Sequence, residues 1–119
     1  MSSTWISVCE KNSLSPNTGI CALVDNEQVA IFWESITKGL FAVANWDPVG
    51  EANVMSRGIV GSLGKALVVS SPLYKQHFDL RSGECLEMPE HNLKTWNVRE
   101  HEGWVQVLAT APSESEKND

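Results

Sequence analysis

The fold of this chain is indicated most clearly by the segment Ser71-Pro72-Leu73-Tyr74-Lys75-Gln76-His77-Phe78-Asp79-Leu80-Arg81-Ser82-Gly83. An apolar run, Ala66–Ser70, comes directly before it, and the pattern predicts strands at 66–70 and 76–80. Pro72 between these strands is typical of a loop, because proline cannot donate a backbone hydrogen bond to a sheet. Residues 66–80 are therefore predicted to form a strand, an exposed loop and a second strand.

Most other apolar runs in the 119 residues are also short and rich in β-branched and aromatic residues, which favours strands over helices. No segment shows a sustained helical period. The further predicted strands are Thr4–Cys9, Gly19–Val24, Gln28–Trp33, Leu40–Asn45, Lys94–Arg99 and Trp104–Leu108. The connections expected between them are a turn at Asp25-Asn26-Glu27, a tight return at Glu102-Gly103, a loop with one helical turn at 11–18 and a mobile glycine-rich hairpin at 58–65. This spacing predicts a small antiparallel barrel or sandwich.

The loop at 71–83 resembles the second cluster-binding loop of Rieske iron–sulfur domains, Cys-Pro-x-His-x-x-x-Phe-Asp-x-x-x-Gly. Ser71 stands where that family has cysteine, and Tyr74 stands where it has histidine. The residues of the family frame that remain are Pro72, Phe78, Asp79, Leu80 and Gly83. The resemblance implies an all-β, Rieske-like [2Fe–2S] domain fold without the cluster.

The first ligand loop follows the strand ending at Trp46, where Asp47-Pro48-Val49 takes the place of the family's Cys-Pro-His. A Rieske centre needs two thiolates and two imidazoles. The residues at the four ligand positions, none of which supplies either group, are Asp47, Val49, Ser71 and Tyr74. We therefore expect no cofactor to be bound by this chain and no metal site at these positions.

The cysteines and histidines elsewhere form no spacing typical of a metal site. They are Cys9, Cys21, Cys85, His77, His91 and His101. Cys9 and Cys21 lie in apolar runs, where a cysteine usually packs as a small hydrophobe, so buried or structural thiols are expected. The odd number of cysteines disfavours a disulfide framework and favours a reducing compartment.

The length suits one domain, and the resemblance places a Rieske-like domain at residues 1–109. Residues 110–119 are small, polar and charged, which predicts a disordered acidic tail, with an acidic docking segment as the alternative. The net charge of −6 disfavours nucleic acid and anionic membranes as partners. No apolar run is long enough for a membrane helix and no export signal is recognised, so a cytoplasmic protein is expected.

A narrower resemblance is to the small subunits of bacterial cytoplasmic NAD(P)H-dependent nitrite reductases. The matching segments are Asn45-Trp46-Asp47-Pro48, Ser56-Arg57-Gly58, the run from Ser70 to Phe78, and Gly83-Glu84-Cys85. The resemblance implies a non-catalytic accessory subunit for the reduction of nitrite to ammonium in nitrate assimilation. Its implied partner is a large subunit that carries FAD, a [4Fe–4S] cluster and sirohaem. A stand-alone electron carrier of Rieske type and a regulatory binding domain are the alternatives.

In Rieske domains the two ligand loops form a tip that docks against an electron partner. The residues that this tip would present for binding the large subunit are Trp46, Pro48, Pro72, Leu73, Tyr74 and Lys75. Aromatic and apolar anchors with polar neighbours suit a protein–protein contact. The alternative is that Trp46 and Tyr74 fill the space of the missing cluster. Asp47 and Asp79 could form a catalytic carboxylate pair, but local bonds to the backbone of their own loops are the preferred interpretation.

Overall fold

The computed structural model describes residues 3–73 and 75–110 of the chain. Its elements in this part are β1 (Ser3–Glu10), η1 (Lys11–Ser13), β2 (Gly19–Val24), β3 (Glu27–Trp33), β4 (Leu40–Ala44), β5 (Trp46–Asp47), β6 (Ala52–Asn53), η2 (Met55–Arg57), β7 (Ile59–Leu63), β8 (Ala66–Ser70), β9 (His77–Asp79), β10 (Thr95–Trp96), β11 (Val98–His101) and β12 (Trp104–Thr110). The two helical segments in the described residues are single 3₁₀ turns. The all-β prediction is confirmed.

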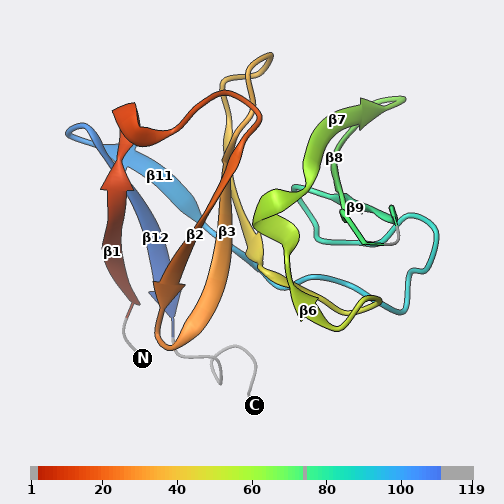
Figure 1. Ribbon diagram of the computed structural model, residues 1–119. Coiled ribbons are helices and arrows are strands. Elements are labelled where there is room, and N and C mark those ends of the chain that lie inside the picture. Colours follow the sequence, from red (N-terminus) through yellow and green to blue (C-terminus); the bar gives the residue numbers. More distant parts are fainter. Residues whose placement is uncertain (1–2, 74, 111–119) are drawn as a thin grey trace.

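Two larger sheets form a sandwich, which occupies the left half of Figure 1. One has the strand order β1-β12-β11 and the other has the order β10-β4-β3-β2, and all pairs are antiparallel. The core between them is apolar and includes Val24, Val29, Ile31, Val105 and Val107. We call these two sheets the large lobe.

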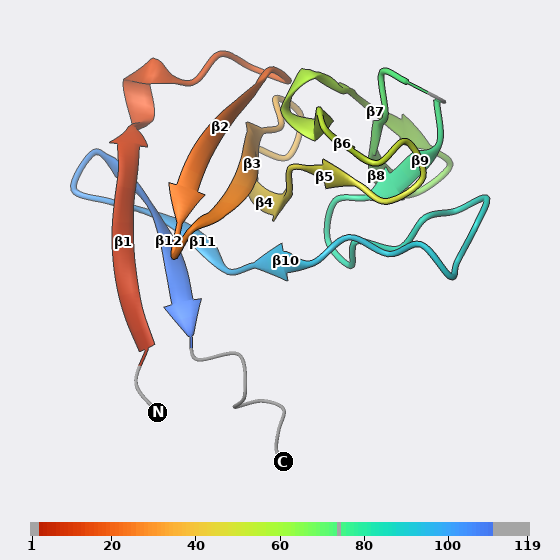
Figure 2. The ribbon, with the colours of Figure 1, turned by 60° about the horizontal axis from the view of Figure 1, so that its bottom comes forward.

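Residues 45–93 form a small lobe, which contains the short β5–β6 ladder and the sheet β7-β8-β9 (Figure 2). A second core lies between this lobe and β3. Ala30 and Phe32 of β3 point into it, whereas Val29 and Ile31 point into the first core. Because β3 is buried on both faces, its sequence is a continuous apolar run instead of an alternating one.

The turns explain why these strands pair as they do. Asp25 and Asn26 both have positive φ (50° and 66°), as a type I′ hairpin turn requires. Glu102 and Gly103 have φ of 53° and 83°, so the β11–β12 turn is of the same kind. The predicted turn at 25–27 and the predicted return at 102–103 are confirmed.

The strands differ from the sequence predictions in two places. The predicted single strand Lys94–Arg99 is two strands, since β10 pairs with β4 in one sheet and β11 pairs with β12 in the other. The hairpin predicted at 58–65 does turn at Gly64 and Lys65, but residues 59–63 before the turn form a strand that was not predicted, β7, which pairs with β8. The loop at 11–18 does contain one helical turn, the η1 segment.

Within residues 3–73 and 75–110, no helix has the length and apolar character that crossing a membrane requires. The tail predicted at 110–119 lies outside the described residues, except for Thr110 at the end of β12.

Candidate functional site

A buried hydrogen bond joins the two loops that the sequence singled out. The hydroxyl Oγ of Ser71 donates to Oδ2 of Asp47 at 2.5 Å, although the two residues are 24 positions apart. Both residues are 0 % exposed. The bond holds the loop after β8 against the loop after β5 at the end of the small lobe.

The Asp47 loop is organised by Asp47 itself. Its Oδ1 accepts the backbone N–H of Val49 at 2.9 Å, and its carbonyl oxygen accepts the N–H of Glu51 at 2.7 Å. Such a carboxylate bond to the backbone two residues further on is a usual way for aspartate to build a turn. The turn therefore fixes the direction of the Asp47 carboxylate toward Ser71.

The Ser71 loop is closed by backbone bonds from the same residue. Ser71 donates its N–H to the carbonyl of Gln76 at 2.9 Å and accepts the N–H of Lys75 at 3.1 Å. Its Oγ accepts the N–H of Leu73 at 3.2 Å while its own proton goes to Asp47. Ser71 is thus fully engaged within the protein, with no free nucleophilic hydroxyl.

The surface of the two loops is partly apolar. Trp46 is 46 % exposed and Leu73 is 45 % exposed, so the indole of Trp46 is not a buried filler between the loops. Pro48 and Pro72 are half-buried and Lys75 is exposed. We call these five residues the tip.

The structure brings the tip residues of the two loops close together. A Cβ at Gly50, in the first loop, would lie 2.6 Å from Cδ1 of Leu73 in the second loop. The absence of a side chain at Gly50 is therefore what allows Leu73 to lie against the first loop. Tyr74, predicted both as a former ligand position and as a tip residue, lies outside the described residues.

Asn45 lies in the segment 45–48 that carries the family resemblance, but no role was predicted for it, and it anchors the first loop to the large lobe. It is 2 % exposed. Its Nδ2 donates to Oε1 of Gln28 at 2.9 Å, and its Oδ1 accepts the N–H of Ser56 at 2.7 Å. An asparagine at the end of an apolar strand is the only sequence signal for this role, because the contacts come from distant segments.

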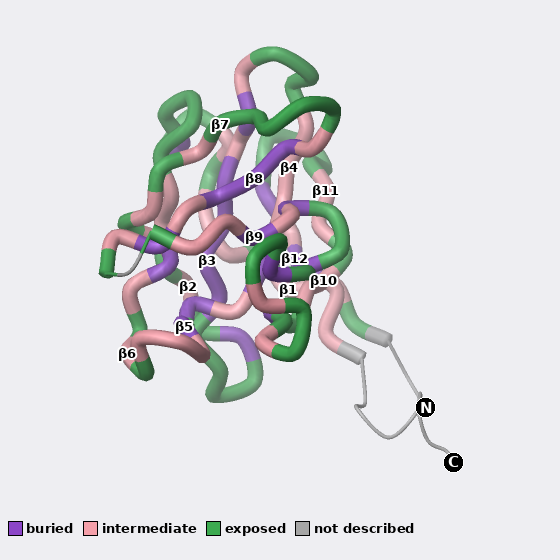
Figure 3. The backbone as a smooth tube through the Cα atoms, turned by 90° about the vertical axis from the view of Figure 1, so that its right-hand side faces the viewer, coloured by how far each residue is buried: buried purple, intermediate pink, exposed green. Residues whose placement is uncertain are grey.

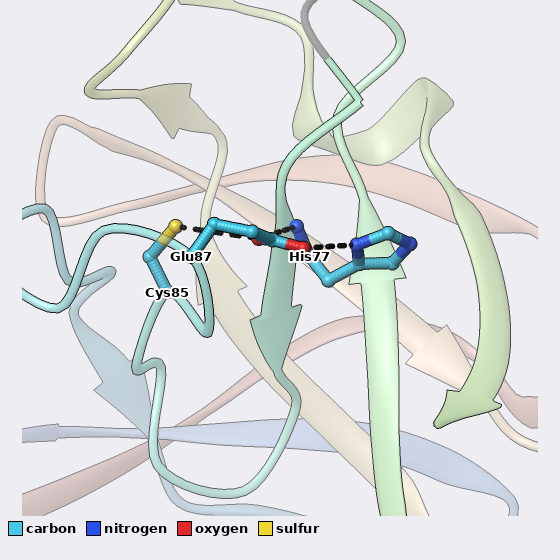
Figure 4. A network of polar contacts seen from close by, with 3 residues as sticks. All are labelled: His77, Cys85 and Glu87. Carbon is cyan, nitrogen blue, oxygen red and sulfur yellow. Dashed lines mark hydrogen bonds and ion pairs between the residues drawn. The ribbon is translucent and has the colours of Figure 1, made fainter. Parts of the chain in front are cut away.

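A second polar network lies beside β9 (Figure 4). Glu87 accepts the N–H of His77 at 2.9 Å and contacts His77 Nδ1 at 2.6 Å. The backbone bond from His77 lowers the pKa of the Glu87 carboxyl, and the thiol of Cys85 lies 3.9 Å from the same carboxylate. Since His77 and Glu87 are 32 % and 46 % exposed, this is a surface clamp on the loop after β9.

The three cysteines are all free thiols in different surroundings. Cys85 is buried and burial raises the pKa of its thiol. Burial also raises the pKa of the half-buried Cys9. Cys21, however, is exposed, so the buried alternative does not hold for its thiol. Cys21 lies on the edge strand β2 opposite Ala30, and its Sγ accepts the Nδ2 of Asn45 at 3.5 Å.

The two aspartates that could have formed a carboxylate pair bond to different partners. Asp79 accepts the N–H groups of Arg81 and Ser82 on Oδ1 at 2.7 and 3.0 Å, all within its own turn. Asp47 is bonded to Val49 and Ser71 instead. The local interpretation agrees with the bonds of Asp79 and with the bond from Val49 to Asp47, whereas the bond between Asp47 and Ser71 joins two loops.

The residues at the ligand positions do not fit a Rieske cluster. Asp47 and Ser71 are bonded to each other, and Val49 has a hydrocarbon side chain that cannot coordinate iron. A tyrosine at position 74 supplies neither thiolate nor imidazole. Among the residues that the structure describes, no three histidine, cysteine or acidic side chains gather in a way that could hold a metal ion.

Comparison with known proteins places this fold and these loops in a family. The family model for Rieske-like [2Fe-2S] domains matches residues 4–108. The nitrite reductase (NADH) small subunit of Salmonella typhimurium is 41 % identical over 105 residues, which cover 88 % of this chain and 97 % of that protein. The NMR structure of the Escherichia coli protein NirD is 38 % identical, with a TM-score of 0.84, and the match covers 92 % of this chain and 100 % of that one.

A further relative has a different length. The large subunit of the nitrite reductase [NAD(P)H] of Klebsiella oxytoca is 36 % identical over 112 residues, which cover 90 % of this chain but 12 % of that protein. The similarity there is confined to one part of a much longer polypeptide. Taken with the full-length matches, these findings show that the chain belongs to the Rieske-like [2Fe-2S] domain family, among the small subunits of NADH-dependent nitrite reductase.

Proposed function

We propose that this chain is the accessory small subunit of an NAD(P)H-dependent nitrite reductase, an oxidoreductase that reduces nitrite to ammonium in nitrate assimilation. The observation that carries the proposal is the 41 % identity to the Salmonella typhimurium small subunit over 97 % of its length. The structure adds the arrangement of the two loops, whose polar groups bind one another. The chain then supplies no catalytic residue of its own.

The partner in this proposal is the large subunit. In Klebsiella oxytoca a segment 36 % identical to this chain lies within a protein named the large subunit of nitrite reductase. Joining two modules in one polypeptide gives them a high effective concentration for each other. The free chain in the present case would reach the same arrangement by binding.

The redox chemistry belongs to the partner in this proposal. The large subunit carries FAD, a [4Fe–4S] cluster and sirohaem, and this chain carries no cofactor. Two observations support a chain without a cluster: the Asp47–Ser71 bond and the absence of any donor atom in the side chain of Val49. Hydride and electron transfer need cofactors that amino-acid side chains cannot replace.

The tip is the proposed surface for the large subunit. Its residues, with Tyr74 added from the sequence, are Trp46, Pro48, Pro72, Leu73, Tyr74 and Lys75. Exposed aromatic and aliphatic side chains beside a cation suit the centre of a protein interface. The bond between Asp47 and Ser71 would hold this surface in one shape before binding, which reduces the entropy lost on association.

A cytoplasmic location belongs to the same proposal. Three free cysteines are compatible with a reducing compartment. Nicotinamide-dependent reduction by the partner would take place in the same compartment.

Reconstitution tests the proposal. The large subunit is purified from cells lacking this chain, and NADH-driven nitrite consumption is measured with and without the added chain. We expect activity to rise on addition and the two chains to co-elute in size-exclusion chromatography. Equal activity in both samples, together with separate elution, would overturn the proposal.

The cluster-free part has its own test. The chain is purified without oxygen, and its visible spectrum, iron and acid-labile sulfide are measured. We expect the spectrum of a tryptophan protein without visible bands. Stoichiometric iron and sulfide would overturn this part and would favour an electron carrier.

A further inference from the structure

Strand β7 is an open edge of the small-lobe sheet. The sheet order is β7-β8-β9, so among residues 3–73 and 75–110 β7 has a neighbouring strand on one side alone. It joins β8 through Gly64 and Lys65, and the pair Leu63–Ala66 flanks this two-residue turn. In such a hairpin the flanking pair exchanges hydrogen bonds, and pairs then alternate along the ladder. The N–H and C=O groups of Val60 and Ser62 therefore point away from β8, toward the open edge.

This edge lacks the features that usually protect an edge strand. The sequence Ile59-Val60-Gly61-Ser62-Leu63 contains no charge and no proline. The edge strand β11, by contrast, carries Arg99, Glu100 and His101. Charged residues and prolines on edges prevent pairing with other chains. Their absence from β7 leaves a strand that can accept another one.

The outward side chains of β7 form an apolar surface with a gap. Ile59 is 68 % exposed and Leu63 is 44 % exposed, and both lie on one face because residues two apart share a face. Gly61 lies between them, and a Cβ placed there would have no heavy atom within 4 Å. Figure 3 shows the contrast, with β8 largely buried and the hairpin toward β7 mainly exposed. An apolar side chain of an added strand would fit over Gly61.

Cations lie at both ends of β7. Arg57 ends the η2 segment just before the strand, and Lys65 is in the turn just after it. Both are exposed, and neither makes an ion pair within the described residues. In the large lobe, by contrast, three cations already have a partner within the chain, because Lys11, Lys94 and Arg99 each lie over an indole ring. A strand added at β7 would thus meet positive charge at each end.

We propose that β7 is a docking edge for an extended acidic segment of the large subunit, which adds to the sheet as a fourth strand. This inference rests on the proposed function and assigns a second contact surface to the same partner. Backbone bonds to Val60 and Ser62 give affinity, while Ile59, Leu63 and the gap at Gly61 select alternating apolar side chains. Arg57 and Lys65 select acidic residues at the segment's ends.

The charges argue against a second copy of this chain as the occupant. An antiparallel pair of β7 strands centred on Gly61 would place Arg57 beside Lys65 of the second copy, and this would happen at both ends. Like charges directly opposite each other in a sheet are unfavourable. An acidic segment turns the same two positions into favourable contacts.

The test measures binding of the purified large subunit to the full-length chain and its variants. Ser62→Pro removes an N–H that faces the open edge and leaves the bonds to β8 in place. Ile59→Glu puts a negative charge on the apolar face. The matched control is Ile36→Glu, because Ile36 is also an exposed isoleucine (81 %) but lies in the turn between β3 and β4. Circular dichroism and the melting temperature confirm that each variant is folded.

We expect Ser62→Pro and Ile59→Glu to raise the dissociation constant about tenfold or more, and Ile36→Glu to leave it unchanged. The amide hydrogens of Val60 and Ser62 should exchange more slowly in the complex than in the free chain. Added salt should weaken the wild-type complex, and Arg57→Gln with Lys65→Gln should reduce that dependence.

Wild-type binding with unprotected Val60 and Ser62 amides, or with full affinity in Ser62→Pro, would overturn the β7 inference and leave the proposed function intact. Failure of the wild-type chain to bind the large subunit at all would overturn both. A concentration-dependent dimer that protects the same two amides would replace the acidic segment with a second copy.

Discussion

Ser71 Oγ and Asp47 Oδ2 are 2.5 Å apart in a position that no solvent reaches, and each residue is 0 % exposed. A buried carboxylate oxygen is costly unless a donor satisfies it. Ser71 supplies that donor to Oδ2, and the N–H of Val49 supplies one to Oδ1. A hydrogen bond between two side chains therefore links the two loops of the tip, at the positions where the Rieske family has cysteine.

Removal of the hydroxyl by Ser71→Ala should lower the free energy of unfolding by about 1–3 kcal/mol, because Oδ2 of Asp47 stays buried without its donor. Urea denaturation followed by tryptophan fluorescence measures the change. Ser62→Ala is the matched control, since Ser62 is exposed on β7, and it should stay within about 0.5 kcal/mol of wild type. A Ser71→Ala protein as stable as the control would show that the bond contributes nothing.

The double variant Asp47→Ala with Ser71→Ala gives a sharper result. If the two side chains act as a unit, the double variant should lose less stability than the sum of the single losses. Strict additivity in the same urea measurements would contradict a coupled pair.

Strands were predicted correctly where local sequence determines them. Asp25 and Asn26 tolerate positive φ, and the apolar runs on either side pair across them. The failure at Lys94–Arg99 has a long-range cause. The chain moves from one sheet to the other at Asn97, whose carbonyl accepts the N–H of Leu108. Nothing in the alternating pattern of residues 94–99 marks that change.

The candidate site shows the same division between features that local sequence predicts and features that depend on long-range contacts. Loop residues 47, 49 and 71 could be identified from the sequence because the Rieske frame around them remains. The bond between Asp47 and Ser71, the anchoring role of Asn45 and the pairing of His77 with Glu87 could not be predicted. Each depends on which distant segments the fold places side by side. Strand β7 was missed within the hairpin predicted at 58–65, since pairing with β8 outweighs the low strand propensity of its glycine.

Gly83 and Gly103 form a matched pair for measuring steric cost. Both have φ of 83°, but a Cβ at Gly83 would overlap the carbonyl oxygen of Leu93, whereas a Cβ at Gly103 would have no heavy atom within 4 Å. Gly103→Ala should therefore cost about 1–2 kcal/mol, from the backbone conformation alone. Gly83→Ala should cost more than about 4 kcal/mol, because backbone must move. Similar melting temperatures for the two variants would contradict this difference.

Glu34 links stability to pH. Its Oε1 accepts the hydroxyl and the N–H of Thr37 at 2.6 and 2.8 Å, and its Oε2 accepts the N–H of Ile36 at 2.8 Å. These bonds, the Thr37 hydroxyl first, lower the pKa of the Glu34 carboxyl in the folded protein. The stabilisation is therefore complete above the unfolded carboxyl pKa of about 4.3 and is lost as the pH falls through the lower folded value.

Glu34→Gln should remove this contribution to acid sensitivity. The variant should be less stable than wild type at neutral pH, because an amide cannot accept all three bonds, and the difference should shrink as the pH falls to about 3. Urea midpoints measured across that range check the result. Glu100→Gln is the control, since Glu100 is exposed on β11. A stability difference that is constant with pH would contradict the linkage.

The tip and the large subunit give the last prediction. Trp46→Ala and Leu73→Ala should each raise the dissociation constant for the large subunit about tenfold or more, because exposed aromatic and aliphatic anchors dominate interface energies. Trp104→Ala is the matched control. Trp104 is 43 % exposed, close to the 46 % of Trp46, but it begins β12 in the large lobe (Figure 1).

Lys75→Ala should act differently from these two variants. An exposed cation at an interface rim mainly speeds association, so the variant should slow association at low salt and have little effect at high salt. Biolayer interferometry with the immobilised large subunit separates association from dissociation. If Trp46→Ala and Trp104→Ala weaken binding equally, or if neither does, then the tip is not the surface that the large subunit recognises.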